Sequence, residues 1–150
     1  MLLNLCNLNY PPYMQLFINL PVEDIQRSRT FFGALGFGFV EGFSGPDNVC
    51  VQLSDHQFVM LLNRPRFADF VKGEVADPRH AVGCTLSIHL DRREEVTALV
   101  EKAFSLGAQP NLPAADHGFM LGWSFLDLDG YLWEPFWMDP AHATAQQAAE

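Results

Sequence analysis

The side chains most often used for metal binding and acid–base chemistry are scattered along this sequence. Its five histidines stand at positions 56, 80, 89, 117 and 142, and no two have the H-x-x-x-H spacing that sets imidazoles on one helical face. Its three cysteines, Cys6, Cys50 and Cys84, include no C-x-x-C pair. We therefore predict no metal site shared by the histidines, no thiolate zinc site and no disulfide framework, and we expect a reducing, cytoplasmic setting.

Other candidates are polar and aromatic side chains on predicted strands, where residues two apart share a face. Three such groups are Phe17 with Asn19, Thr85 with Ser87 and His89, and Glu134 with Phe136 and Met138. His89 stands near a strand end, so it either contacts a ligand or faces solvent. His117 precedes the penultimate predicted strand and is either a ligand contact or a turn residue.

Composition and charge limit the partners. The chain has 150 residues, of which 49% are hydrophobic and only 18% charged, so it is long and apolar enough for one domain with a real core. Its 13 phenylalanines suit either a ring-lined pocket or a Phe-rich core. A net charge of -9 argues against nucleic acid and anionic membranes as partners. The start lacks a basic segment and no apolar run approaches a membrane span, so we expect neither a signal peptide nor a membrane anchor.

The chain then divides into two halves with the same order of elements. Pro21 ends the first predicted strand, Glu23 and Asp24 place negative charge at the start of a helix, and Gly36 closes that helix. The predicted strands of this half cover residues 15–20, 37–41, 48–53 and 57–62.

The second half repeats this order. Asp91, with Glu94 three residues on, is predicted to cap its helix, and Gly107 closes it. Asp129-Gly130 is the predicted hairpin turn before the last strand. The predicted strands of this half cover residues 84–90, 108–112, 119–126 and 131–138.

This repeat predicts an α+β domain of two βαβββ modules. The modules cover residues 14–63 and 83–140, within one domain of residues 14–140. The linker, residues 64–82, forms either a short helix over the sheet or a bridging loop. Residues 1–13 are expected to be an N-terminal extension and 141–150 a C-terminal tail.

Two motifs resemble the vicinal oxygen chelate superfamily, which includes glyoxalase I, bleomycin-resistance proteins and extradiol dioxygenases. The first is Leu20-x-Val22-x-Asp24-x-x-x-Ser28-x-x-Phe31-Phe32-x-x-Leu35-Gly36, and the second is Ser124-Phe125-x-Asp127-x-Asp129-Gly130-x-x-Trp133-Glu134. The resemblance covers about residues 14–140. Within the superfamily, the two motifs resemble a glyoxalase-like branch. It implies a curved mixed sheet around a pocket, with the helices outside.

Metal-binding members of that superfamily take one ligand from the first and one from the last strand of each module. Carried over one by one, these positions fall on Phe17, Met60 (or Leu61 if the strand slips by one), Thr85 and Glu134. Only Glu134 has a side chain that binds metal. One carboxylate does not hold a divalent ion against water, so we expect no metal cofactor.

The resemblance therefore implies a protein that binds a small molecule in an aromatic-lined cleft. We expect Phe17, Asn19, Met60, Thr85, Ser87, His89, His117 and Phe136 to be the ligand-binding residues. Glu134, directed into an aromatic cleft, would lose hydration, which would raise its pKa and suit it as a base or ligand contact. It could equally be retained for strand geometry and satisfied by a neighbour such as Asn19.

The alternative function is a metal-dependent lyase similar to lactoylglutathione lyase, or a ring-cleaving dioxygenase. The resemblance also implies a homodimer, because members of this superfamily commonly cover the apolar edges and surfaces of the open sheet with a second chain.

The replaced ligand positions predict that the purified protein carries no stoichiometric Ni, Zn, Fe or Mn. Elemental analysis of protein prepared without chelators tests this, and one equivalent of any of these metals would contradict it.

Overall fold

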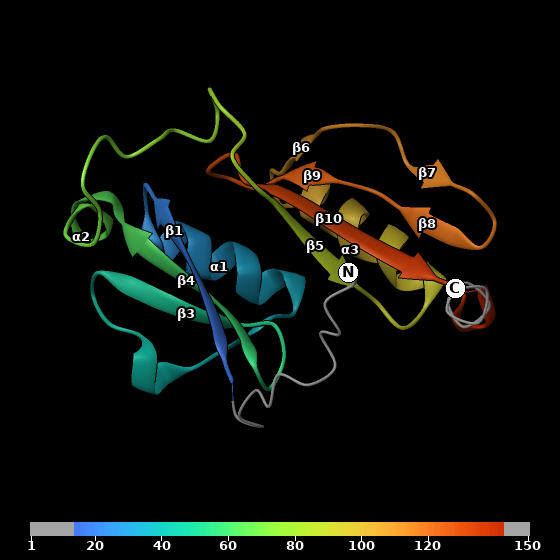
Figure 1. Cartoon of the computed structure of the whole chain (residues 1–150), viewed down its shortest axis with the longest axis horizontal. Coiled ribbons are helices and arrows are strands. Elements are labelled where there is room, and N and C mark those ends of the chain that lie inside the picture. Colours follow the sequence, from blue (N-terminus) through green and yellow to red (C-terminus); the bar gives the residue numbers. More distant parts are fainter. Residues whose placement is uncertain (1–13, 143–150) are drawn as a thin grey trace, which may run out of the picture.

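The computed structural model describes residues 14–142 (Figure 1). The predicted extension, residues 1–13, and most of the predicted tail lie outside the described residues. Among the described residues, no helix is long and apolar enough to cross a membrane.

The first module forms a sheet with the strand order β1-β4-β3-β2. Strands β1 and β4 pair in parallel, whereas β4 with β3 and β3 with β2 pair antiparallel. The elements are β1 (Leu16–Val22), α1 (Ile25–Leu35), β2 (Gly38–Phe39), the 3-10 helix η2 (Glu41–Phe43), β3 (Asn48–Gln52) and β4 (Gln57–Asn63).

The second module forms a separate sheet around its last strand. Strand β10 pairs in parallel with β5 on one side and antiparallel with β8 and β9 on the other. The short helix α2 (Arg64–Ala68) lies in the predicted linker. The second module's elements are β5 (Thr85–His89), α3 (Arg93–Ser105), β6 (Gln109–Pro110), β7 (Ala115–Asp116), β8 (Met120–Gly122), β9 (Phe125–Leu126) and β10 (Leu132–Met138).

The fold is thus the predicted α+β arrangement of two βαβββ-like modules. The strands of each module pair with one another and form one sheet. Helices α1 and α3 lie on the same side of the two sheets, behind them in Figure 1. One hydrophobic core fills the space between helices and sheets, and it draws residues from both modules. Phe32 of α1 contacts the fully buried Trp133 of β10, with ring centroids 5.2 Å apart. In each strand, every second side chain points away from the helices and the core. We call the sheet surfaces on this side the open faces.

Both helices end as predicted, because glycine can adopt the positive φ that a helix stop needs. Gly36 has φ 102° and Gly107 has φ 101°. The start of α1 differs slightly from the prediction, since Asp24 precedes the helix and caps it by accepting a hydrogen bond from the Arg27 N–H at 2.9 Å.

Three local predictions were wrong. Pro21 does not end β1, because this strand is at the sheet edge, where a missing N–H is tolerated. Asp91 and Glu94 do not cap α3; the helix starts later, and the Glu95 carboxylate accepts a hydrogen bond from the Arg92 N–H at 3.1 Å. The strand predicted at residues 119–126 is divided into β8 and β9, since Trp123 and Ser124 interrupt the ladder.

The turn before β10 is built on a buried carboxylate. One oxygen of Asp127 accepts hydrogen bonds from the N–H groups of Asp129 and Tyr131, and the other accepts the Trp133 Nε1–H at 2.8 Å. Burial raises the pKa of Asp127 to about 6, although the three N–H donors act in the opposite direction. The predicted Asp129-Gly130 turn is therefore present, with Gly130 at φ 96°.

The neighbouring Asp129 connects this turn to the first module. Its carboxylate is buried and accepts hydrogen bonds from the Glu23 N–H at 2.9 Å, the Arg27 guanidinium at 2.9 Å and the Ser28 hydroxyl at 3.2 Å. Ser28 and Asp129 belong to the two different sequence motifs. The motifs thus contact each other and hold the two modules together.

We predict that Asp129→Ala lowers the free energy of unfolding by about 3 kcal/mol, because it leaves buried donors without an acceptor. Urea unfolding measures this change. The matched control is Asp55→Ala at the corresponding turn of the first module, where the side chain is exposed; it should change stability by less than about 0.5 kcal/mol. Equal effects of the two substitutions would contradict a special role for Asp129.

Candidate functional site

The open face of the second sheet brings together most of the predicted site residues. Because β5 and β10 pair in parallel, Thr85 lies beside Leu132, Ser87 beside Glu134 and His89 beside Phe136. The core residues of these strands point to the helix side, so Thr85, Ser87, His89, Glu134 and Phe136 share the opposite face.

A pocket of about 380 Å³ lies on this face, and we call it the Glu134 pocket. Its apolar wall includes Leu112, Met120, Trp123, Leu132 and Phe136, and its polar side chains are Asn111, Ser124 and Glu134. Pro113, Ala115 and Gly122 complete the lining. The Asn111 amide donates to the Ser124 hydroxyl at 3.1 Å, so these two groups satisfy each other.

The pocket exists because the small residues Gly122 and Ala115 lie beside the large side chain of Phe136. Gly122 is paired with Phe136 on one side and with Ala115 on the other. A Cβ atom added at Gly122 would lie 3.9 Å from the Cβ of Phe136, which is ordinary contact. Gly122 does not have positive φ, so its lack of a side chain is not required by the backbone. It leaves space on the sheet.

Glu134 is exposed at the edge of this pocket. The Ser87 hydroxyl donates to Glu134 Oε2 at 3.1 Å, so the neighbour that satisfies the carboxylate is Ser87 and not Asn19. Within residues 14–142, no Lys, Arg or His nitrogen lies within 4.0 Å of the Glu134 carboxylate. The expected loss of hydration does not occur in the single chain, because the side chain remains accessible to water.

The other predicted positions lie on the open face of the first sheet. Phe17 stacks on Phe58 with centroids 4.8 Å apart and contacts the edge of Phe43 at 5.8 Å. The Met60 sulfur accepts a hydrogen bond from the Asn48 amide at 3.2 Å. Asn19 lies beside Met60 and is exposed. No hydrogen bond or ring contact among the described residues joins this group to Glu134.

The two candidate histidines are both exposed and lie outside the pocket lining. The ring of His89 contacts Phe136 at 5.2 Å, so His89 borders the apolar wall. His117 lies between β7 and β8, where its N–H donates to the Met120 carbonyl. Its neighbour Asp116 is ion-paired with Arg93 of α3, which fixes this hairpin against the helix.

The side chains at the family's metal positions do not fit a divalent ion. Phe17 offers no donor, Met60 offers a thioether already engaged by Asn48, and Thr85 offers a hydroxyl. Within residues 14–142, no three His, Cys, Asp or Glu side chains are grouped closely enough to hold a metal ion. A hard cation needs several oxygen or nitrogen donors, and this chain brings one carboxylate to the position.

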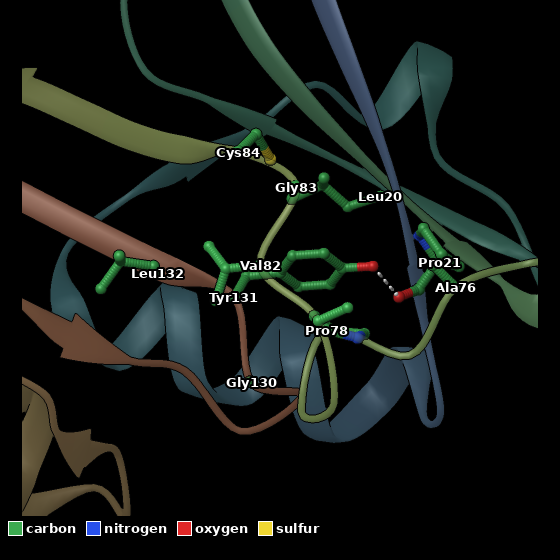
Figure 2. A pocket seen from close by; sticks show the side chains of 11 residues that line it. Leu20, Pro21, Ala76, Pro78, Val82, Gly83, Cys84, Gly130, Tyr131 and Leu132 are labelled. Atoms are coloured by element: carbon green, nitrogen blue, oxygen red, sulfur yellow. Dashed lines mark hydrogen bonds between the residues drawn. The ribbon is translucent and has the colours of Figure 1, made fainter.

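A second pocket, of about 150 Å³, lies where the modules meet and is shown in Figure 2. Residues 76–84 of the connection run across it, between the end of β1 and the start of β10. The Tyr131 ring forms one wall, and its hydroxyl donates to the Pro21 carbonyl at 2.8 Å (Figure 2). Burial raises the pKa of Tyr131, which keeps it protonated. Because this hydroxyl is already engaged, we assign the pocket to the packing of the modules.

Sequence reasoning missed the segment that walls the Glu134 pocket. Residues 111–115 were predicted partly as strand, and β7 was not predicted. The available signal was Gly122, since a glycine inside a strand pattern often marks a close approach or open space. Glu134 and Phe136 were the two predicted site residues that the pocket includes.

Comparison with known proteins agrees with this arrangement. Residues 15–54 match the family model "Bleomycin resistance protein-like N-terminal". A glyoxalase-related enzyme from Fulvimarina pelagi is 24% identical with a TM-score of 0.69, over 81% of this chain and 85% of that chain. The chain thus has the fold of a glyoxalase-related protein, and its residues 15–54 match a bleomycin-resistance-like family model.

Two further solved structures share this fold. A hypothetical protein from S. aureus is 24% identical with a TM-score of 0.69, over 81% of this chain and 92% of that chain. A bleomycin resistance determinant encoded on transposon Tn5 is 21% identical with a TM-score of 0.58, over 83% of this chain and 98% of that chain. No curated protein is significantly similar to the chain. These likenesses show the fold, and the function must be argued from the site.

Proposed function

We propose that this protein binds a small organic molecule in the Glu134 pocket and does so without the metal site of the superfamily's enzymes. The observation that carries the proposal is the combination of an apolar hollow beside Phe136 with a carboxylate at its edge that forms no ion pair within residues 14–142. A pocket of about 380 Å³ is within the size range of small-molecule sites. The Tn5 relative is named as a bleomycin resistance determinant, which is consistent with a binding role.

The donors at the family's ligand positions favour binding over metal-dependent catalysis. A lyase or dioxygenase of the metal-dependent kind needs a cation that polarises the substrate, and Phe17, Met60 and Thr85 are poor ligands for it. We assign Glu134 and Phe136 to direct ligand contact. Ser87 orients the carboxylate through its hydrogen bond, and Thr85 and His89 border the site on β5.

A second chain is part of the proposal. Large apolar side chains remain exposed, among them Leu16 at 55%, Phe43 at 52% and Leu112 at 68% of their surface. A homodimer that covers them would also enclose the Glu134 pocket and could bring Phe17, Asn19 and Met60 of one chain toward a ligand bound by the other. The cytoplasmic location stays a prediction from the cysteine content.

We predict that Gly122→Leu weakens ligand binding at least tenfold, because the leucine side chain fills the hollow beside Phe136. The probes are neutral, cationic and anionic aromatic fragments, and ligand-observed NMR measures their binding. The matched control is Gly38→Leu on the first sheet, where an added Cβ meets only the Gln52 side chain at 3.9 Å. Fragments that bind the parent and both variants equally, or a parent that binds none, would contradict the proposed site.

We also predict a homodimer at micromolar concentration, since one chain leaves these apolar surfaces exposed. Sedimentation velocity measures the mass in solution. A single species near 16.9 kDa would count against the dimer.

A further inference from the structure

We infer that the ligand of the Glu134 pocket is an organic cation, with a positively charged nitrogen beside the Glu134 carboxylate and an apolar body against Phe136 and Met120. This inference rests on the proposed function and adds the chemical class of the ligand. It follows from the charges around the pocket, from the donors that Glu134 lacks and from the composition of the wall.

The Glu134 carboxylate is only partly satisfied within the described chain. Ser87 donates one neutral hydrogen bond to Oε2, and no described residue donates to Oε1. By contrast, Asp116 has the Arg93 guanidinium as an ion-pair partner, and Asp129 has that of Arg27. Glu134 therefore presents an uncompensated negative charge at the edge of an apolar hollow, which is where a ligand's positive group would be attracted.

The surroundings reinforce this sign. The described residues that line the pocket include no Lys, Arg or His, so a negatively charged ligand would find no counter-charge among them. The whole chain carries a net charge of -9, which repels anions and attracts cations at long range. An anionic ligand is thus disfavoured both by contact and by the field of the protein.

The apolar wall separates an organic cation from a metal ion. A divalent ion needs several donors to replace its water shell, and Glu134 is the single carboxylate that residues 14–142 bring to the lining. An ammonium group on an apolar body needs fewer, because burial of that body against Leu112, Met120 and Phe136 supplies much of the affinity. The Phe136 ring face can add a cation–π contribution.

Three probes with the same phenyl body test the inference: phenethylamine, phenethyl alcohol and hydrocinnamate, which are cationic, neutral and anionic at neutral pH. We expect NMR titration to show phenethylamine binding at least about fivefold more tightly than the alcohol, which corresponds to about 1 kcal/mol for an accessible charge pair. Hydrocinnamate should bind most weakly. Added salt should reduce the preference for the amine.

Variants of the full chain locate the effect. Glu134→Gln should lower the affinity for the amine at least about fivefold and thereby remove its preference over the alcohol. Glu101→Gln, an exposed carboxylate on α3 outside the pocket, changes the net charge equally and should keep the preference.

The outcomes separate this inference from the proposed function. If the alcohol binds as tightly as the amine and Gly122→Leu abolishes both, the pocket stands and the cation inference is overturned. If Gly122→Leu leaves amine binding intact, or if none of the probes binds the parent, the proposed site and the inference are both overturned.

Discussion

The structure depends on the hydrogen bonds that two aspartates make in the turn before β10. Asp127 holds the turn closed through three N–H groups of its own module, and Asp129 accepts three hydrogen bonds from the start of the first module's helix. Both carboxylates are buried, so each satisfied donor matters more than it would in water. The turn places Trp133 against Phe32, which continues the core from one module into the other. The modules are joined by polar contacts at a corner and by rings at the centre.

This joint decides which side of each strand is available for function. With both helices and the shared core on one side, the alternate residues of β1, β4, β5 and β10 point to the open faces. The four family ligand positions all lie there, on two sheets that hydrogen bonds do not connect. Within one chain, Glu134 consequently has Ser87 and Phe136 as neighbours, while Phe17 packs on Phe58 and Phe43. The ligand site that we propose for one chain therefore draws on the second sheet.

Features set by a few adjacent residues were predictable from the sequence. Gly36, Gly107 and Asp129-Gly130 stop or turn the chain through local backbone geometry, and the repeat of these signals gave the two modules. The strand alternation also placed Glu134 and Phe136 on one face correctly. Features that depend on neighbours distant in sequence were missed. Pro21 is tolerated because β1 is an edge strand, and the hollow at Gly122 requires the pairing of β8 with β7 and β10. The carboxylate's partner likewise followed from the β5–β10 register, which put Ser87 beside it.

The carboxylate of Glu134 can have a different role when the other three ligand positions hold no metal ligands. In a complete set of metal ligands, a bound cation would neutralise the negative charge of this carboxylate, which would then attract an organic ligand only weakly. With Phe, Met and Thr at the other positions, its charge is not shared, and the surfaces around it are apolar. The same position can then select a ligand by charge rather than by coordination, because one carboxylate suffices for an ammonium group and not for a hard dication. Ser28 and Asp129 of the two motifs lie at the joint between the modules, whereas the residues that we propose for ligand contact lie on the open faces. Substitutions at the proposed contact residues can therefore change ligand chemistry without breaking the joint.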